Sequence, residues 1–175
     1  FLVEGENVTA FVDNYNSTVN GAVTYPVIAD PANLEINRAQ VTWTGLADTE
    51  VVLGRQRIVL GNARFVGNVG FRQNEQTFDA IRIGIRPTKD FAVTYAYVDR
   101  VRRVFGHRSA QGEWDSDSHV IQADLKTPAG QASGYSYLLD FGNAPTQSSA
   151  TWGGRFAGSR PIRPGLAITY EAEVA

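Results

Sequence analysis

The stretch that decides the fold is EVVLGRQRIVLGNARFVGNVGFRQNEQTFDAIRIGIR, residues 50–86. Its two ends alternate in polarity, and a glycine-rich crossing at 61–74 separates them. Successive side chains of a strand point to opposite faces, whereas a helix would scatter the same residues around its circumference. In 75–86 the pattern has period two, which predicts a strand. Its alternating residues are Ile81, Ile83 and Ile85 on one face and Arg82 and Arg86 on the other.

The segment 50–60 shows the same period. Arg55 and Arg57 share one parity with Leu53, so they would lie side by side on one face of a strand. The polar faces therefore carry arginine, where an ordinary solvated sheet carries serine and threonine. The opposite faces are hydrophobic. This combination predicts an all-β, antiparallel, up-and-down transmembrane β-barrel with lipid outside and a charged channel inside.

Three strings in the chain resemble the alginate-export family of bacterial outer-membrane porins. They are LGRQRIVL (53–60), RFVGNVGFRQNEQTFDAIRI (64–83) and GEWDSDSH (112–119), within a similarity of style that runs over about residues 1–175. The resemblance implies a barrel in the outer membrane of a Gram-negative bacterium. Its implied partners are membrane lipid, lipopolysaccharide, and an anionic small-molecule or polyuronate solute that crosses passively.

Composition sets further bounds. The chain has 175 residues, of which 43% are hydrophobic, and a net charge of −2 that gives no reason to expect nucleic acid binding. No run approaches the roughly 18 apolar residues of a transmembrane helix, so any crossing must use strands. Cysteine is absent, which excludes disulfides and thiol metal sites. The chain begins and ends inside expected strands, so we interpret it as an internal piece, 1–175, of a longer barrel.

The charge is unevenly distributed along the chain. Residues 38–103 hold 11 Lys and Arg against 6 Asp and Glu, while the remainder holds 5 against 12. Basic central strands are thus flanked by acidic ones. Random clustering of sign on a solvated surface is the alternative interpretation.

The alternation predicts nine strands of roughly ten residues, the length that a tilted membrane strand requires. Together they would form an incomplete arc of a larger barrel. The expected strands are 1–11, 34–46, 50–60, 75–86, 91–103, 118–127, 130–141, 148–159 and 166–174.

Short and long connectors alternate between these strands, as turns and extracellular loops do in outer-membrane barrels. The long connectors are expected to face away from the cell, and they are 12–33, 61–74, 104–117 and 142–147.

Arginines from consecutive strands are the candidate channel lining. Neighbouring strands of an up-and-down barrel usually pair, so their polar faces should adjoin. Arginine stays protonated and offers a fork of donors suited to carboxylates, and a wall of such groups passes anions on if each binds weakly. Salt bridging that stiffens the barrel is the alternative. The candidate pore-lining residues are Arg38, Arg55, Arg57, Arg64, Arg72, Arg82, Arg86, Arg100, Arg102, Glu171 and Glu173.

The crossing at 61–74 combines glycines with Arg64 and Arg72. Phe65 and Phe71 give it apolar surface that should leave water. We therefore expect it to fold into the barrel and narrow the channel. An exposed loop that packs on its neighbours is the alternative.

The sequence predicts neither an enzyme nor a cofactor. The acidic string at 113–117 lacks the glycine and terminal Glu of an EF-hand, so a turn stabilised by Asp and Ser is favoured, with Ca²⁺ binding by loop 104–117 left open. His107 and His119 have no supporting catalytic motif. The alternatives to a porin are an outer-membrane barrel with a structural, adhesive or enzymatic role and no pore, and a soluble β-sandwich.

Overall fold

The computed structural model describes residues 1–12 and 14–175; Asp13, which belongs to the expected loop 12–33, lies outside the described residues. The described chain is built almost entirely from β-strands, with one short 3₁₀ helix. In order, the elements are β1 (Leu2–Val8), β2 (Asn33–Trp43), β3 (Thr49–Gln56), β4 (Thr77–Ile85), β5 (Phe91–Arg102), β6 (Glu113–Thr127), β7 (Gly130–Leu139), η1 (Pro145–Gln147), β8 (Ser149–Arg163) and β9 (Leu166–Val174).

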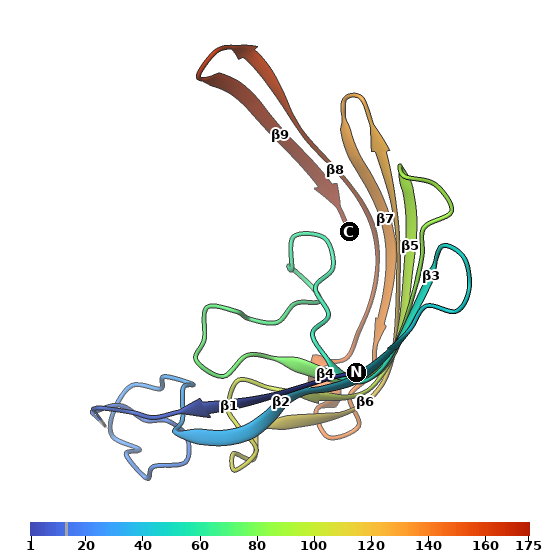
Figure 1. Cartoon of the computed structure of the whole chain (residues 1–175). Helices are drawn as coiled ribbons and strands as arrows, with labels where there is room; N and C mark the ends of the chain where they lie inside the picture. The colour runs from blue at the N-terminus through green and yellow to red at the C-terminus, as the bar shows by residue number, and fades with distance from the viewer. Residues whose placement is uncertain (13) are drawn as a thin grey trace.

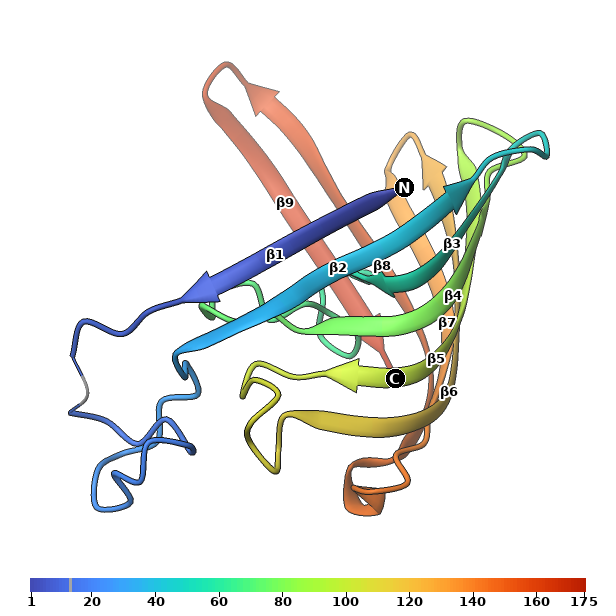
Figure 2. The same ribbon diagram turned by 60° about the horizontal axis from the view of Figure 1, so that its bottom comes forward.

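Each strand pairs antiparallel with the next one in the chain, which gives a single nine-stranded sheet in sequence order (Figure 1). The prediction of an all-β, up-and-down sheet of nine strands is confirmed. The sheet bends into an open arc and is not closed into a barrel, because β1 and β9 form its two edges (Figures 1 and 2).

The connections alternate in length, as expected. Short turns join β2 to β3, β4 to β5, β6 to β7 and β8 to β9, and they lie at one end of the sheet (Figure 2). The longer connections lie at the other end, and we call this the long-loop end. One of them, residues 57–76 between β3 and β4, lies inside the arc (Figure 1), and we call it the crossing segment.

The core lies on the concave face of the sheet, beneath the crossing segment. Ile58, Leu60 and Val66 of that segment are buried against the strands. The strands contribute the inward-facing side chains Phe78, Ala80, Ala96, Val98, Val101, Val120, Tyr135 and Tyr137. A single curved sheet therefore obtains a packed interior from its own loop, without a second sheet.

Two glycines allow groups of a neighbouring strand to approach the backbone closely. Gly54 has a φ of +111°, and a Cβ there would lie 2.3 Å from the Ala39 carbonyl oxygen on β2. A Cβ on Gly153 would lie 2.5 Å from the Tyr135 ring, its direct cross-strand partner. The missing side chain lets that ring lie flat over β8.

The expected loop 104–117 is too long, because β6 already begins at Glu113. Asp and Ser favour turns in isolation, yet here they alternate, with Ser116 and Ser118 buried on the concave side and the acidic residues outside. Glu113 and Asp115 pair with arginines of β5. These ion pairs between β5 and β6 stabilise the longer strand, and local sequence preference does not predict them.

Candidate functional site

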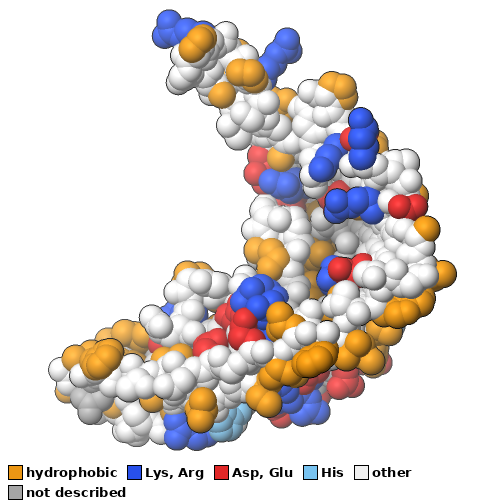
Figure 3. Space-filling model, viewed as in Figure 1, with side chains coloured by type: hydrophobic (Ala, Val, Ile, Leu, Met, Phe, Trp, Pro, Cys, Tyr) orange, Lys and Arg blue, Asp and Glu red, His pale blue; other side chains and the backbone are white. Residues whose placement is uncertain are grey.

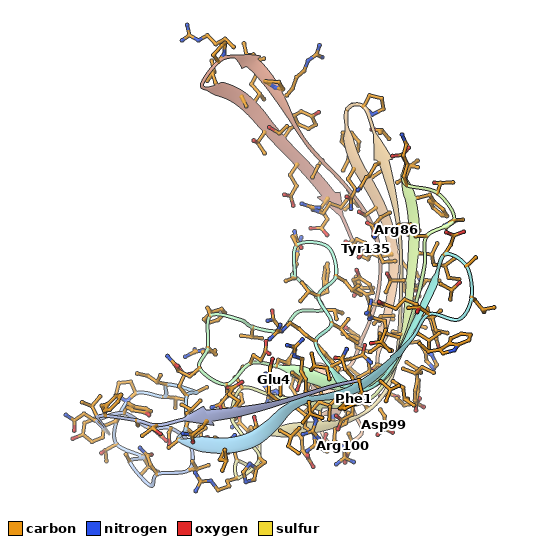
Figure 4. All side chains as sticks on the ribbon, in the orientation of Figure 1. Phe1, Glu4, Arg86, Asp99, Arg100 and Tyr135 are labelled. Atoms are coloured by element: carbon orange, nitrogen blue, oxygen red, sulfur yellow. The ribbon has the colours of Figure 1, made fainter. Side chains whose placement is uncertain are left out.

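The candidate site is the concave face of the arc together with the crossing segment. Glu4 and Tyr135 point into the arc, whereas Asp99 and Arg100 lie on its outer side (Figure 4). Basic and acidic side chains meet inside the hollow, and hydrophobic side chains follow much of the convex edge (Figure 3).

The structure separates the candidate arginines. Arg38, Arg57, Arg64 and Arg82 lie on the concave side, as do Glu171 and Glu173. Arg72 pairs with Asp30 of the first long connection at 3.2 Å. Arg86 is exposed at the short turn that follows β4. Arg55, Arg100 and Arg102 lie on the convex face, which corrects the expectation that all these arginines line one wall.

Arg100 and Arg102 lie on the convex face because β5 contains a β-bulge. Asp99 is an extra residue in β5 relative to β4, between Val98 and Arg100. Such a residue shifts the alternation, so every later side chain changes face. Val101 is accordingly buried inside, and the two arginines beside it point outward.

Arg55 and Arg57 lie on opposite faces of the sheet for another reason, which is the end of β3. Arg55 shares the convex face with Leu53, which is 59% exposed, and its Nε donates to Asp79 Oδ1 at 2.7 Å. β3 ends at Gln56, so Arg57 leaves the alternation of the strand. Its guanidinium turns to the concave side, where its Nε donates to Glu75 Oε2 at 2.7 Å.

Each candidate arginine on the concave face has a carboxylate partner. Arg38 pairs with its cross-strand neighbour Glu4, and Arg82 lies 2.8 Å from Glu50. Arg155, which the sequence analysis did not single out, lies 2.8 Å from Glu171. Its parity within β8, opposite Glu173, is the signal that identifies it. The wall therefore carries fixed charges of both signs, close together.

The crossing segment reaches over the hollow to the far edge of the sheet. Arg64 Nη1 lies 3.3 Å from Glu173 Oε2, and Asn62 Nδ2 donates to Glu171 Oε1 at 3.1 Å. The Phe65 ring centroid lies 5.8 Å from that of Tyr135. This half of the segment packs inside the arc, as the sequence predicted.

The second half of the segment behaves differently, and here the prediction is wrong. Phe71 is 81% exposed, because this part turns toward the first long connection. Arg72 and the backbone N–H of Gln73 both bind Asp30 there. The Phe71 ring lies 5.3 Å from the Arg72 guanidinium instead of entering the core.

Glu75 anchors the base of the crossing segment. It accepts hydrogen bonds from Arg57, from Asn68 Nδ2 at 2.8 Å and from Asn37 Nδ2 at 2.7 Å. Burial alone would raise the pKa of Glu75, but these donors outweigh it and hold the pKa below its ordinary value. The same pairing raises the pKa of Arg57. The contact is thus an ionised pair at neutral pH.

The kinds of side chain on the convex face change along the length of the strands. Toward the short turns, Ile83 of β4, Tyr95 of β5 and Ile121 of β6 lie side by side as cross-strand partners. The next row toward the long loops contains Ile81, Tyr97 and His119, and the Nδ1 of His119 lies 2.8 Å from the Oη of Tyr95.

Toward the long loops the convex face carries a row of alternating charges, which we call the convex ladder. Asp79 lies between Arg55 and Arg102, and Glu113 lies between Arg102 and Arg100. The ladder runs across β3 to β6 in the order Arg55, Asp79, Arg102, Glu113, Arg100 and Asp115.

A shallow hollow of about 610 Å³ opens at the short-turn end, bordered by Glu50, Arg82 and Thr94. Across residues 1–12 and 14–175, no three His, Asp or Glu side chains gather closely enough to hold a metal ion. In the part of the chain that the structure describes, no helix is both long and apolar enough to span a membrane. Comparisons with models of known protein families, with curated proteins and with solved structures found no match.

Proposed function

We propose that this chain forms part of the wall of an outer-membrane porin resembling the alginate-export family. In this proposal the convex face contacts lipid, and the concave face lines a passive channel for small hydrophilic solutes, sugar acids and small carboxylates among them. The observation that carries it is the segregation of the two faces. The convex residues Leu53, Ile85 and Ile121 are exposed hydrophobic side chains. On the concave side the short-turn half carries the Arg82–Glu50 ion pair, whereas the ion pairs of the convex face lie in the convex ladder, toward the long loops.

The grading of the convex face supports the same orientation. Lipid-facing surfaces of outer-membrane barrels have an apolar band bordered by aromatic residues. Isoleucine and tyrosine side chains share two adjoining rows, with His119 beside Tyr97, and the convex ladder follows these rows toward the long-loop end. The long loops would then lie outside the cell, and the ladder would lie at the level of the lipopolysaccharide headgroups.

The charged side chains of the concave face indicate which solutes the channel would pass. Arginine and carboxylate pairs provide donors and acceptors for the hydroxyl and carboxylate groups of a sugar acid. Because each candidate arginine described on the concave face is already paired, a passing anion competes with a resident carboxylate and is held weakly, as permeation requires. The crossing segment, held to β9 by Arg64 and Glu173, would form part of the constriction.

The test is single-channel recording from the complete protein in planar bilayers with a KCl gradient. We expect a stable conductance that sodium galacturonate reduces. Glu173→Gln should move the reversal potential toward anion selectivity and Arg64→Gln toward cation selectivity, more strongly at low salt. Arg86→Gln, at an exposed turn, is the matched control and should change neither.

Two results would contradict the proposal. A folded, inserted protein without conductance would favour a barrel with a structural, adhesive or enzymatic role. Identical selectivity in the Glu173→Gln and Arg64→Gln variants would show that the crossing segment does not line the conduction path.

A further inference from the structure

Among the described residues, the buried side-chain polar atoms without a hydrogen-bond partner are concentrated in one place. They are Glu6 Oε1, Asn74 Oδ1 and both amide atoms of Asn33. Asn33 is 6% exposed and Asn74 is 1% exposed. Buried polar groups are nearly always paired, so a group of unpaired ones indicates that something else binds there.

The register of β1 and β2 brings two carboxylates together. Glu6 is the direct cross-strand partner of Glu35, and Asn33 lies two positions along, opposite Val8. Directly opposed side chains have Cβ atoms about 5 Å apart, and like charges in such pairs destabilise a sheet. A positive charge between the two strands would remove this repulsion.

The crossing segment brings an amide oxygen to the same place. Asn74 Nδ2 donates to the Pro31 carbonyl at 3.1 Å, two residues before Asn33. This contact fixes the amide orientation and leaves Asn74 Oδ1 free. On either side, Gln73 N–H binds Asp30 and Glu75 accepts from Asn37, so the segment lies along the start of β2.

The neighbouring arginines do not supply the missing charge. Arg38 is paired with Glu4, and Arg57 with Glu75. Within the described chain, the basic group nearest Glu35 is His107, whose Nδ1 lies 3.7 Å from Glu35 Oε2. Two acidic side chains thus remain without a full counter-charge beside unpaired amide oxygens.

We propose that Glu6, Glu35, Asn33 and Asn74 bind a divalent cation of the hard, oxygen-preferring kind, with Ca²⁺ the best match. Carboxylate and amide oxygens are its ordinary protein ligands, and its flexible coordination suits donors from two strands and a loop better than the octahedral demand of Mg²⁺. Two carboxylates balance its charge. The site uses no residue of the acidic string 113–117, and it tethers the crossing segment to the edge of the sheet.

The test is calorimetric titration of CaCl₂ into the complete, chelator-treated protein in detergent. We expect saturable binding at one site, at least tenfold weaker binding of MgCl₂, and at least tenfold loss of Ca²⁺ affinity in Glu6→Gln. Glu50→Gln, a concave carboxylate near the short turns, is the matched control and should bind as the parent does. Glu35→Gln replaces Glu6→Gln if the latter does not fold.

Thermal unfolding provides a second measurement, in which the parent and Glu6→Gln should respond differently to Ca²⁺ and to chelator. Ca²⁺ should raise the Tm of the parent and leave that of Glu6→Gln unchanged. In chelator, Glu6→Gln should melt at or above the Tm of the parent, because the repulsion with Glu35 is gone. Absence of saturable binding by the parent would mean that these atoms bind water only, and unchanged affinity in Glu6→Gln and Glu35→Gln would also overturn the proposal. Neither result depends on whether the protein conducts.

Discussion

At the scale of single residues, Asp79 holds the convex ladder together. Its Oδ1 accepts from Arg55 at 2.7 Å and its Oδ2 from Arg102 at 3.1 Å, so one carboxylate joins β3, β4 and β5. The side chain is only 25% exposed. Asp115, at the end of the same ladder, is 60% exposed and has one arginine partner.

Replacing Asp79 by Asn should therefore cost more stability than replacing Asp115 by Asn. We expect Asp79→Asn to lower the free energy of unfolding by about 1–3 kcal/mol, since two half-buried guanidinium groups lose their counter-charge. Asp115→Asn should lower it by less than about 1 kcal/mol, as exposed pairs do. Urea unfolding of the detergent-folded protein measures both. Equal losses in the two variants would contradict the central role of Asp79.

The bulge at Asp99 shows where sequence reasoning at this scale fails. Strict alternation places Arg100 and Arg102 with Ala96, whereas the extra residue moves them to the face of Tyr97. A bulge depends on which strands pair and in which register, and a single sequence does not contain that information. The end of β3 at Gln56 separates Arg55 from Arg57 in the same way.

At the scale of elements, the crossing segment combines two roles. Its first half supplies the apolar cover of the concave face through Phe65 and Val66. Its second half binds the first long connection through Arg72 and Asp30. The sequence predicted the inward fold from the glycines, the two arginines and the apolar content of the segment, but Phe65 and Phe71 are equally apolar. The ring that stays outside, Phe71, precedes the two residues that bind Asp30 of the first long connection.

These two phenylalanines form a matched pair for experiment. Phe65→Ala should lower the free energy of unfolding by about 2–4 kcal/mol, since its ring packs on Tyr135 and Tyr137. Phe71→Ala, at an exposed position, should change it by less than about 0.5 kcal/mol. Chemical denaturation at neutral pH measures both changes. A larger effect at Phe71 would contradict the packing described for the segment.

At the scale of the whole molecule, the strand number, order and connector lengths could be predicted because each rests on local period and turn composition. Ile81, Ile83 and Ile85 carry that period unbroken through β4. The distribution of arginines between the two faces could not be predicted, because it depends on strand ends, the bulge and cross-strand partners. Arg155 escaped notice for the same reason, since its role comes from Glu171 and Glu173 on the next strand.

The central claim is that the convex face contacts lipid while the concave face contacts water. The chain contains no cysteine, so single cysteines can carry spin labels at successive positions of β4. In lipid-reconstituted protein, labels at Ile81 and Ile83 should be more accessible to oxygen, and labels at Arg82 and Gly84 to a water-soluble nickel chelate. A two-residue period with that phase is the predicted result. Preferential access of the chelate at Ile81 and Ile83, or no alternation at all, would contradict the account.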